Sequence, residues 1–314
     1  MIHLKDLGTF ESVPDLVTDI INGNITALES ALKNGLDIHK LIQIGKYSEY
    51  SPLQLALVMD CLPSVKWLVE HGADLNDKEN PSFLLAVRYA DQKVIDYVVA
   101  HGANIHALNC VNVDAFQAAL YGKRYENLQL IHDLGHSVQK YGGRAFRNVI
   151  TDQNYEVLDF FINNSVDIDY NKPDSVYPFK PTPLCVAARY VDLQMCKYLV
   201  EHGADVIITE KDSIAIEKGD MEMAEYFKNL EPTEYHDRQN KMDQLKPFKL
   251  PKALISFLEG DNLYFELPDS DFISIEFLPL LDTVPFKWGR RKLLRLSKEL
   301  GEYNDYQIVW DPKS

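Results

Sequence analysis

The chain has 314 residues, of which 46% are hydrophobic, and its 32 basic residues against 47 acidic ones give a formal net charge of −15. This length is enough for about two domains with ordinary cores, and no apolar run approaches the roughly 18 residues that a membrane span requires. Phosphate groups would be repelled by so much negative charge, which argues against a nucleic-acid partner.

The N-terminus and the cysteines indicate a cytoplasmic protein. The first residues lack the charged and then apolar pattern of a secretory signal, so we expect the mature protein to start at Met1. The four cysteines, Cys61, Cys110, Cys185 and Cys196, form no CxxC pair. This spacing argues against a zinc site or a disulfide framework and favours buried free thiols in a reducing compartment. We expect no metal and no cofactor.

A two-helix unit is predicted to recur along residues 14–231. The first unit, residues 14–35, ends at Gly35. Further units are predicted at 51–74, 81–104, 114–138, 144–167 and 180–205, and a weaker seventh at 213–231. In five of them a residue of the first helix and the terminating residue are 16 positions apart: Ala56 and Gly72, Ala86 and Gly102, Ala119 and Gly135, Val149 and Ser165, Ala187 and Gly203. A constant offset of this kind predicts a repeat protein.

The clearest unit, Lys180 to Asp205, shows what each position does. Thr182 can cap the first helix, and Pro183 suits its first turn. Ala187 is small where two helices approach, and Gly203 can adopt the left-handed conformation that ends the second helix. The start Thr182-Pro183-Leu184 resembles the ankyrin repeat, a unit of about 33 residues that opens Thr-Pro-Leu-His-x-Ala. The resemblance implies a mainly α fold, an ankyrin-repeat solenoid of about seven helix-turn-helix units.

Three features depart from that pattern or could suggest chemistry. The family's histidine is replaced by other residues, namely Gln54, Leu84, Gln117 and Cys185. His71, His101 and His202 each precede a terminating glycine. Repeats place such residues about 10 Å apart, so we expect them to cap helix ends and not to bind a metal. Gly142-Gly143 lacks the GxxxxGK[ST] pattern of a phosphate loop, and we expect turn glycines in a connection between repeats.

The polar run Glu231 to Asn240 breaks the period and predicts a boundary between an ankyrin-repeat domain, 1–235, and a small α+β C-terminal domain, 241–314. In the latter we predict helices at 252–258 and 290–300 and strands at 262–267, 272–278 and 306–310. The start Leu250-Pro251 resembles the SMI1/KNR4 (SUKH) immunity family, although the family's Gly-Gly after the helix is missing. The basic cluster 287–292 with Arg295 is interpreted as a solvated helix face, or as a surface that docks on the acidic repeats or on a partner.

Two enlarged connections, 37–50 and 166–181, are the candidate binding loops. Tyrosine together with acid suits the recognition of a basic protein, because tyrosine supplies contact area and a polar tip at low entropic cost. The alternative is that these tyrosines pack the loops onto their own repeats. The candidate partner-binding residues are Tyr47, Glu49, Tyr50, Asp169, Tyr170, Asp174 and Tyr177.

No catalytic constellation is visible in the sequence, so we expect neither an enzyme nor a small-molecule substrate. The ankyrin resemblance implies a protein-binding module. A divergent, acidic array with an SMI1/KNR4-like tail resembles bacterial immunity proteins, which implies neutralisation of a basic toxin by covering its active surface. The alternative is a general scaffold or host-directed effector, with the C-terminal module as a second docking site.

Overall fold

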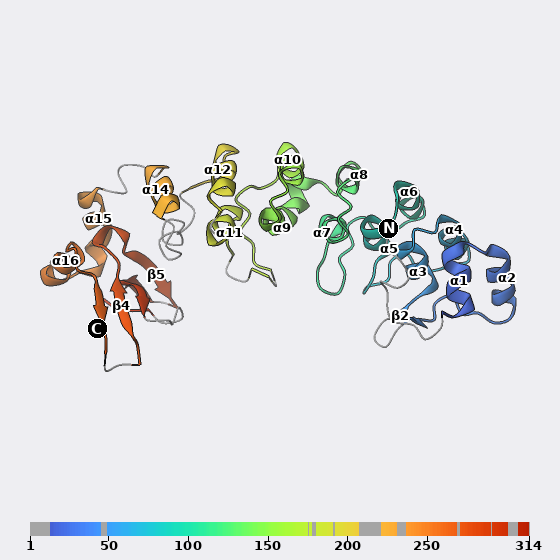
Figure 1. The fold of residues 1–314 in the computed structure, drawn as a ribbon, viewed down its shortest axis with the longest axis horizontal. Helices are drawn as coiled ribbons and strands as arrows, with labels where there is room; N and C mark the ends of the chain where they lie inside the picture. Colours follow the sequence, from blue (N-terminus) through green and yellow to red (C-terminus); the bar gives the residue numbers. More distant parts are fainter. Residues whose placement is uncertain are drawn as a thin grey trace. The chain divides into compact units, whose positions relative to one another are not determined.

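The computed structural model describes residues 13–44, 49–174, 176–177, 180–190, 192–206, 221–230, 237–268, 271–289, 291–300 and 307–313. The chain divides into two compact units, Met1–Asp174 and Ser175–Ser314. Figure 1 labels the helices and strands of each unit. The first unit is built from paired helices. The second unit contains a further helix pair, a single helix and a small α+β module.

The described part of the first unit contains five helix pairs. These are α1 (Asp15–Asn22) with α2 (Ile25–Lys33), α3 (Pro52–Val58) with α4 (Leu62–Glu70), α5 (Ser82–Tyr89) with α6 (Gln92–Ala100), α7 (Ala115–Tyr121) with α8 (Asn127–Asp133), and α9 (Val138–Val149) with α10 (Tyr155–Asn163). The first helices pack in series, α3 on α5, α5 on α7 and α7 on α9. The core lies along this row, where Ala56, Phe83, Ala86, Phe116 and Ala119 are fully buried.

The terminating slot is left-handed in each repeat of the first unit. Gly35, Gly72, Gly102 and Gly135 have φ angles of 94°, 90°, 97° and 103°. Ser165 occupies the same slot with a φ of 60°, so the fifth unit keeps the backbone geometry although it has lost the glycine. In each case the helix ends because this residue turns the chain back and satisfies the last carbonyl groups.

Histidine caps the second helix of three repeats, which confirms the prediction. The Nδ1 atoms of His71 and His101 lie 2.7 Å from the carbonyl oxygens of Trp67 and Tyr97, each one helical turn earlier. The rings of these pairs also contact one another, with centroids 4.2 and 3.9 Å apart. In the second unit, His202 repeats the arrangement on Tyr198 at 2.7 Å.

The prediction of turn glycines at Gly142-Gly143 is wrong. Both residues lie inside α9, which begins at Val138, ahead of the predicted start at residue 144. A Cβ atom on Gly143 would lie 2.3 Å from Cδ2 of Tyr170, and one on Gly142 would lie 2.8 Å from Cγ1 of Val138. Close packing therefore explains both glycines and overrides their weak helix propensity: the loop residue Tyr170 lies against Gly143, and Phe161 of α10 lies against Gly142.

In the second unit, α11 (Pro183–Arg189) and α12 (Leu193–Glu201) form the clearest predicted repeat. Thr182 caps α11 by accepting a hydrogen bond from the N–H of Cys185 at 3.3 Å, and Ala187 is buried. The second helix of the weak seventh unit is present as α14 (Met221–Leu230). Its predicted first half, residues 213–220, lies outside the described residues.

The C-terminal module has two three-stranded antiparallel sheets. One has the order β3 (Tyr264–Glu266), β4 (Ser274–Phe277), β7 (Ser297–Leu300); the other has β5 (Val284–Trp288), β6 (Arg291–Arg295), β8 (Val309–Trp310). Helices α15 (Arg238–Leu245) and α16 (Lys252–Leu258) share one core with them, containing Leu245, Leu258, Leu294 and Leu296. The predicted helix at 252–258 is confirmed, and the strands predicted at 262–267 and 272–278 are present in shorter form as β3 and β4. Of the strand predicted at 306–310, Val309–Trp310 form β8, and residue 306 lies outside the described residues.

The helix predicted at 290–300 is wrong, because this segment forms strands β6 and β7. Gly289, with a φ of 60°, lies at the turn of a hairpin formed by β5 and β6. At one end of the hairpin Val284 pairs with Arg295, and at the other Trp288 pairs with Arg291. Leu293, Leu294 and Leu296 are buried within this strand arrangement and not on the face of a helix. Arg291, Lys292 and the 74%-exposed Trp288 therefore lie on a hairpin and not on a helix.

Two further expectations concern the boundary and the thiols. The boundary at 231–240 remains a prediction: residues 231–236 lie outside the described part, and Arg238–Asn240 already belong to α15.

Three of the free cysteines are buried as expected, but Cys110 is exposed. It lies in the connection between α6 and α7.

The buried N-cap of α7 should make stability depend on pH. Asp114 accepts a hydrogen bond from the N–H of Gln117 at 2.9 Å, and burial raises the pKa of its carboxyl to about 6. The folded state thus binds this proton more tightly than the unfolded state, so the contribution of Asp114 to stability falls as pH rises from about 4 to about 6. Asn can also cap a helix. On going from pH 4 to pH 6, the free energy of unfolding of Asp114→Asn should rise by about 2 kcal/mol relative to that of wild type.

Urea unfolding at pH 4 and pH 7 measures this difference directly. The exposed Asp152→Asn is the matched control for removing one negative charge from the same unit. A constant difference between Asp114→Asn and wild type at the two pH values would contradict the prediction.

Candidate functional site

The first enlarged connection folds as a β-hairpin ahead of α3. Strand β1 (Ile42–Gln43) pairs with β2 (Glu49–Tyr50) so that Ile42 faces Tyr50 and Gln43 faces Glu49. Glu49 is exposed and Tyr50 is half-buried. Tyr47, the third candidate of this loop, lies outside the described residues. Because β2 contacts α3, the helix holds the hairpin against the body of the repeats.

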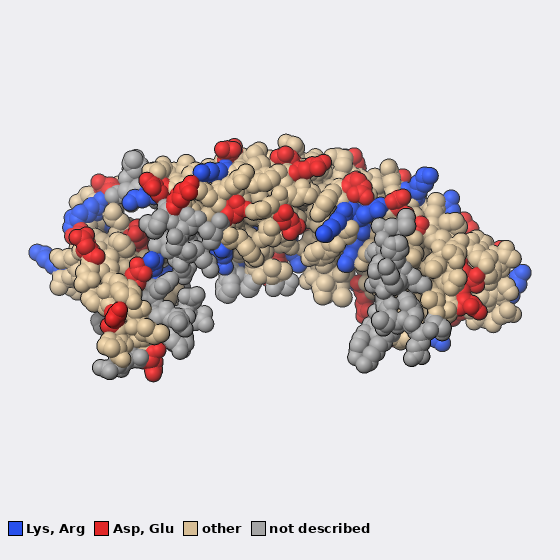
Figure 2. Space-filling view, in the orientation of Figure 1, with Lys and Arg blue, Asp and Glu red and all other residues tan. Residues whose placement is uncertain are grey.

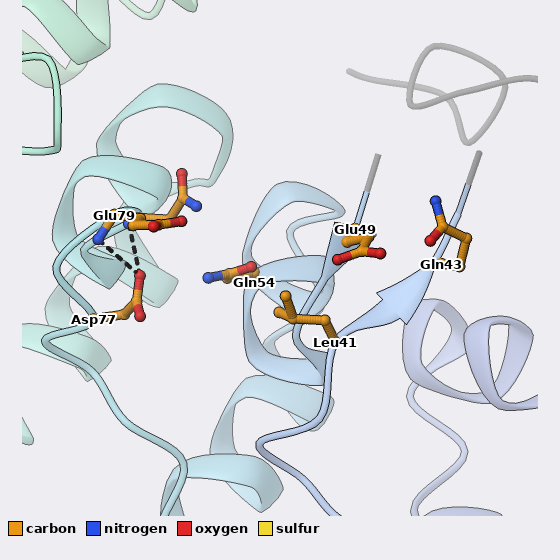
Figure 3. A pocket seen from close by; sticks show the side chains of 7 residues that line it. Leu41, Gln43, Glu49, Gln54, Asp77 and Glu79 are labelled. Carbon is orange, nitrogen blue, oxygen red and sulfur yellow. Dashed lines mark hydrogen bonds between the residues drawn. The ribbon is translucent and has the colours of Figure 1, made fainter. Parts of the chain in front are cut away.

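A pocket of about 410 Å³ lies between this hairpin and the connection that precedes α5 (Figure 3). Its lining consists of three carboxylates, three amides and one leucine: Glu49, Asp77, Glu79, Gln43, Gln54, Asn80 and Leu41. Leu41 is 50% exposed. The site is acidic and polar, with a single apolar surface.

The wall opposite the hairpin is a fixed turn. Oδ1 of Asp77 accepts hydrogen bonds from the N–H groups of Glu79 at 3.0 Å and Asn80 at 2.8 Å, as the dashed lines in Figure 3 show. Asn76 ties the turn to the next connection, donating to the carbonyl of Gly102 at 3.0 Å and accepting from the N–H of Asn104 at 2.8 Å. The Asp77 carboxylate is thus held by backbone contacts of its own turn.

Gln54 forms the floor of the pocket and is 7% exposed. It takes part in a capping box: Ser51 accepts from the N–H of Gln54 at 3.2 Å, and Oε1 of Gln54 accepts from the N–H of Ser51 at 3.0 Å. Since the oxygen is fixed on the backbone, the amide nitrogen points the other way, toward the Asp77 side of the pocket (Figure 3). Gln117 makes the same capping box two units later, but there Nε2 is buried.

The second enlarged connection is engaged with its own repeat. Asp174 lies 2.5 Å from Nη2 of Arg147 and 3.5 Å from Nε of Arg144; its side chain is 5% exposed and that of Arg147 is fully buried. The Tyr170 ring lies 5.0 Å from Cζ of Arg147 and packs on Gly143. For Tyr170 and Asp174 the geometry therefore matches the alternative interpretation, in which the loop packs onto its repeat. Asp169 is half-buried.

Of the sequence-predicted residues that the structure describes, Glu49 lines this pocket, with Tyr50 beside it on the same strand. Tyr177 belongs to the second unit and is half-buried. Sequence reasoning missed the facing turn and the role of Gln54. The run Asp77-Lys78-Glu79-Asn80, just before a repeat start, was an available signal, because it places acid and amide groups in the neighbouring connection.

Apolar groups are also exposed on the connections of the first unit. Leu108 and Val111, between α6 and α7, are 52% and 62% exposed. Among the described residues, no group of His, Cys, Asp and Glu side chains is arranged to hold a metal ion. None of the described helices has the length and hydropathy of a bilayer-crossing segment.

A family model described as the ankyrin repeat matches residues 48–80 and 182–211. The first match runs from β2 through α3 and α4 to the Asp77 turn, so it contains most of the pocket. The second match contains α11 and α12. Both matches coincide with units that the sequence period predicts, and the predicted fold class, helical repeats followed by a small α+β module, is confirmed.

Proposed function

We propose that this chain, an ankyrin-repeat protein, is a non-enzymatic module that binds a basic protein partner in the cytoplasm. The observation that carries the proposal is the acidic pocket between the hairpin and the Asp77 turn. Ankyrin repeats indicate a protein-binding module, and exposed apolar side chains on the connections, such as Leu41, Leu108 and Val111, are the kind of groups that protein partners cover.

The charge distribution supports a basic partner. From Lys241 onward the chain has 11 basic and 12 acidic residues, so the first 240 residues carry a net charge of −14. Among the residues that Figure 2 draws in colour, acidic side chains are spread over the helices instead of gathering in one place. A diffuse negative field of this kind accelerates encounter with a basic protein, while a local site determines where it binds.

The finer proposal is an immunity-type role, in which the acidic surface covers the active surface of a basic toxin. It is supported by the charge of the repeat region and by the resemblance of residues 250–258 to the start of the SMI1/KNR4 family. The alternative is a scaffold or effector in which the C-terminal module is a second docking site. A toxin gene directly beside this one would favour the immunity role.

Binding kinetics test the proposal. Attraction between charges is screened over about 8 Å at physiological ionic strength. The association rate of a partner captured from the native source should therefore fall steeply with added salt, while its dissociation rate changes less. Tyr50→Ala and Tyr177→Ala should each raise the dissociation rate. If the residue is a hot spot, the loss of binding free energy should be about 2 kcal/mol.

Tyr125→Ala is the matched control, because this tyrosine lies beyond the C-terminal end of α7, away from the connections that precede the first helices. Circular dichroism should show that all three variants stay folded. An acidic partner, or kinetics that respond neither to salt nor to Tyr50 and Tyr177, would rule out the proposed recognition. Binding that vanishes only on deletion of 241–314 would assign it to the C-terminal module.

A further inference from the structure

We infer that the pocket beside Gln54 receives an arginine side chain of the partner, presented on a peptide segment whose main-chain carbonyl accepts a hydrogen bond from Gln54. In this arrangement the guanidinium lies between Glu49 and the Asp77–Glu79 turn, and its methylene stem lies on Leu41. The inference deepens the proposed function and rests on it for the basic nature of the partner.

The carboxylates supply the first part of the argument. Glu49 stands on the hairpin wall, and Asp77 and Glu79 stand on the turn that faces it (Figure 3). Within the described part of the chain, none of the three forms an ion pair, whereas Asp91 and Asp174 are each paired with arginine. Lys78 belongs to the same turn but does not line the pocket. The negative charge of the site is therefore not neutralised by its own lining.

Gln54 supplies the second and independent part. Its side chain is more than nine-tenths buried, and its Oε1 is committed to the N–H of Ser51, so Nε2 is a donor directed into the pocket. A polar group left without a partner once the pocket is covered costs about 1–3 kcal/mol. A ligand that fills this pocket must therefore bring an acceptor as well as positive charge.

These two requirements select the ligand. A guanidinium has five donors and no acceptor, and a metal ion has neither, so the acceptor must come from another part of the same ligand. A main-chain carbonyl next to a basic side chain meets both needs. Arginine fits better than lysine, because its planar fork can donate to carboxylates on two walls while an ammonium is a point charge. The volume of about 410 Å³ is in the range of ligand pockets and admits one side chain with its peptide group.

The test is a titration of the full chain, labelled with ¹⁵N, with N-acetyl-arginine methylamide. The side-chain amide of Gln54 and the backbone amides of Glu49 and Glu79 should shift saturably. The citrulline analogue has almost the same shape without the charge and should produce no saturable shift. The lysine analogue should bind about fivefold more weakly, because it loses the forked contacts.

Substitutions locate the site. Glu49→Gln and Glu79→Gln should each weaken binding of the arginine compound about threefold to fivefold. Glu29→Gln is the matched control, since it removes the same charge from the exposed face of α2 in the same unit and should leave the affinity unchanged.

Three results would overturn the assignment: no saturable shift with the arginine compound, equal shifts with the citrulline analogue, or an equal effect of Glu29→Gln and Glu49→Gln. Calcium chloride that shifts the same resonances and displaces the arginine compound would show a metal-ion site instead. If a basic partner bound the Glu49→Gln, Glu79→Gln double variant with wild-type kinetics, the pocket assignment would be wrong and the proposed function would stand. If the pocket bound the arginine compound but the natural partner were acidic, the pocket assignment would stand and the proposed function would be wrong.

Discussion

Asp174→Ala should destabilise the first unit by about 3–5 kcal/mol, because it removes the carboxylate that faces a fully buried arginine. Arg147 would keep its hydrogen bond to the carbonyl of Lys172 at 2.9 Å but would lose the countercharge 2.5 Å from Nη2. Arg144, 3.5 Å from the same carboxylate, would lose it as well. Urea unfolding followed by far-ultraviolet circular dichroism measures the change in the free energy of unfolding.

Two comparison variants sharpen this experiment. Asp174→Asn keeps an acceptor without the charge and should cost less than Asp174→Ala. Asp152→Ala removes an exposed carboxylate between α9 and α10 and should change stability by no more than about 0.5 kcal/mol. If Asp174→Ala changed the free energy of unfolding no more than Asp152→Ala does, the ion pair with Arg147 would not hold the 166–174 loop in solution. Tyr170 and Asp174 would then again be candidates for partner binding.

Gly122→Ala should cost about 3 kcal/mol or more, at the upper end of the range for overpacking. A Cβ atom at this position would lie 2.0 Å from the carbonyl oxygen of Arg88 and 2.9 Å from its carbonyl carbon. Gly122 ends α7, and Arg88 lies in the last turn of α5, against which α7 packs. Because the atoms that clash with the added Cβ belong to the backbone of α5, the clash can be removed only if α5 and α7 move apart.

A pair of double variants distinguishes this mechanism from ordinary crowding. Arg88→Ala should not restore the stability of Gly122→Ala, because the clashing atoms remain. Two of the three atoms nearest to a Cβ on Gly143 belong to the Tyr170 ring, and the third is the Cβ of Tyr170. Tyr170→Ala should therefore offset a large part of the cost of Gly143→Ala, a coupling that a double-mutant cycle reports. Recovery of Gly122→Ala by Arg88→Ala would show that the obstacle is the arginine side chain and not the backbone.

Much of the repeat region could be predicted from the sequence because its signals are local. A glycine or a permissive residue in a left-handed slot, an N-cap residue before a helix and a histidine one turn after an aromatic residue each act within a few positions. The period therefore located the helix pairs of the first unit, except for the start of α9, and it predicted the correct register even at Ser165. The candidate loops were also found in this way, since 37–50 and 166–181 exceed the spacing of the other connections.

The tertiary structure decided what depends on residues that are far apart in the chain. Leucines at 293, 294 and 296 fit a helix or a strand equally well, and strand partners at Val284 and Val309 decide for the strand. Gly143 lies in a helix against which Tyr170 packs, and Gly142 lies beside Phe161 of α10. The pocket follows the same principle: Glu49 was predicted as a binding residue, but Gln54 and the Asp77 turn become parts of one site only when two connections face each other. Local hydrogen bonding and sterics can be read from neighbouring residues, whereas packing between distant segments depends on contacts that no local pattern encodes.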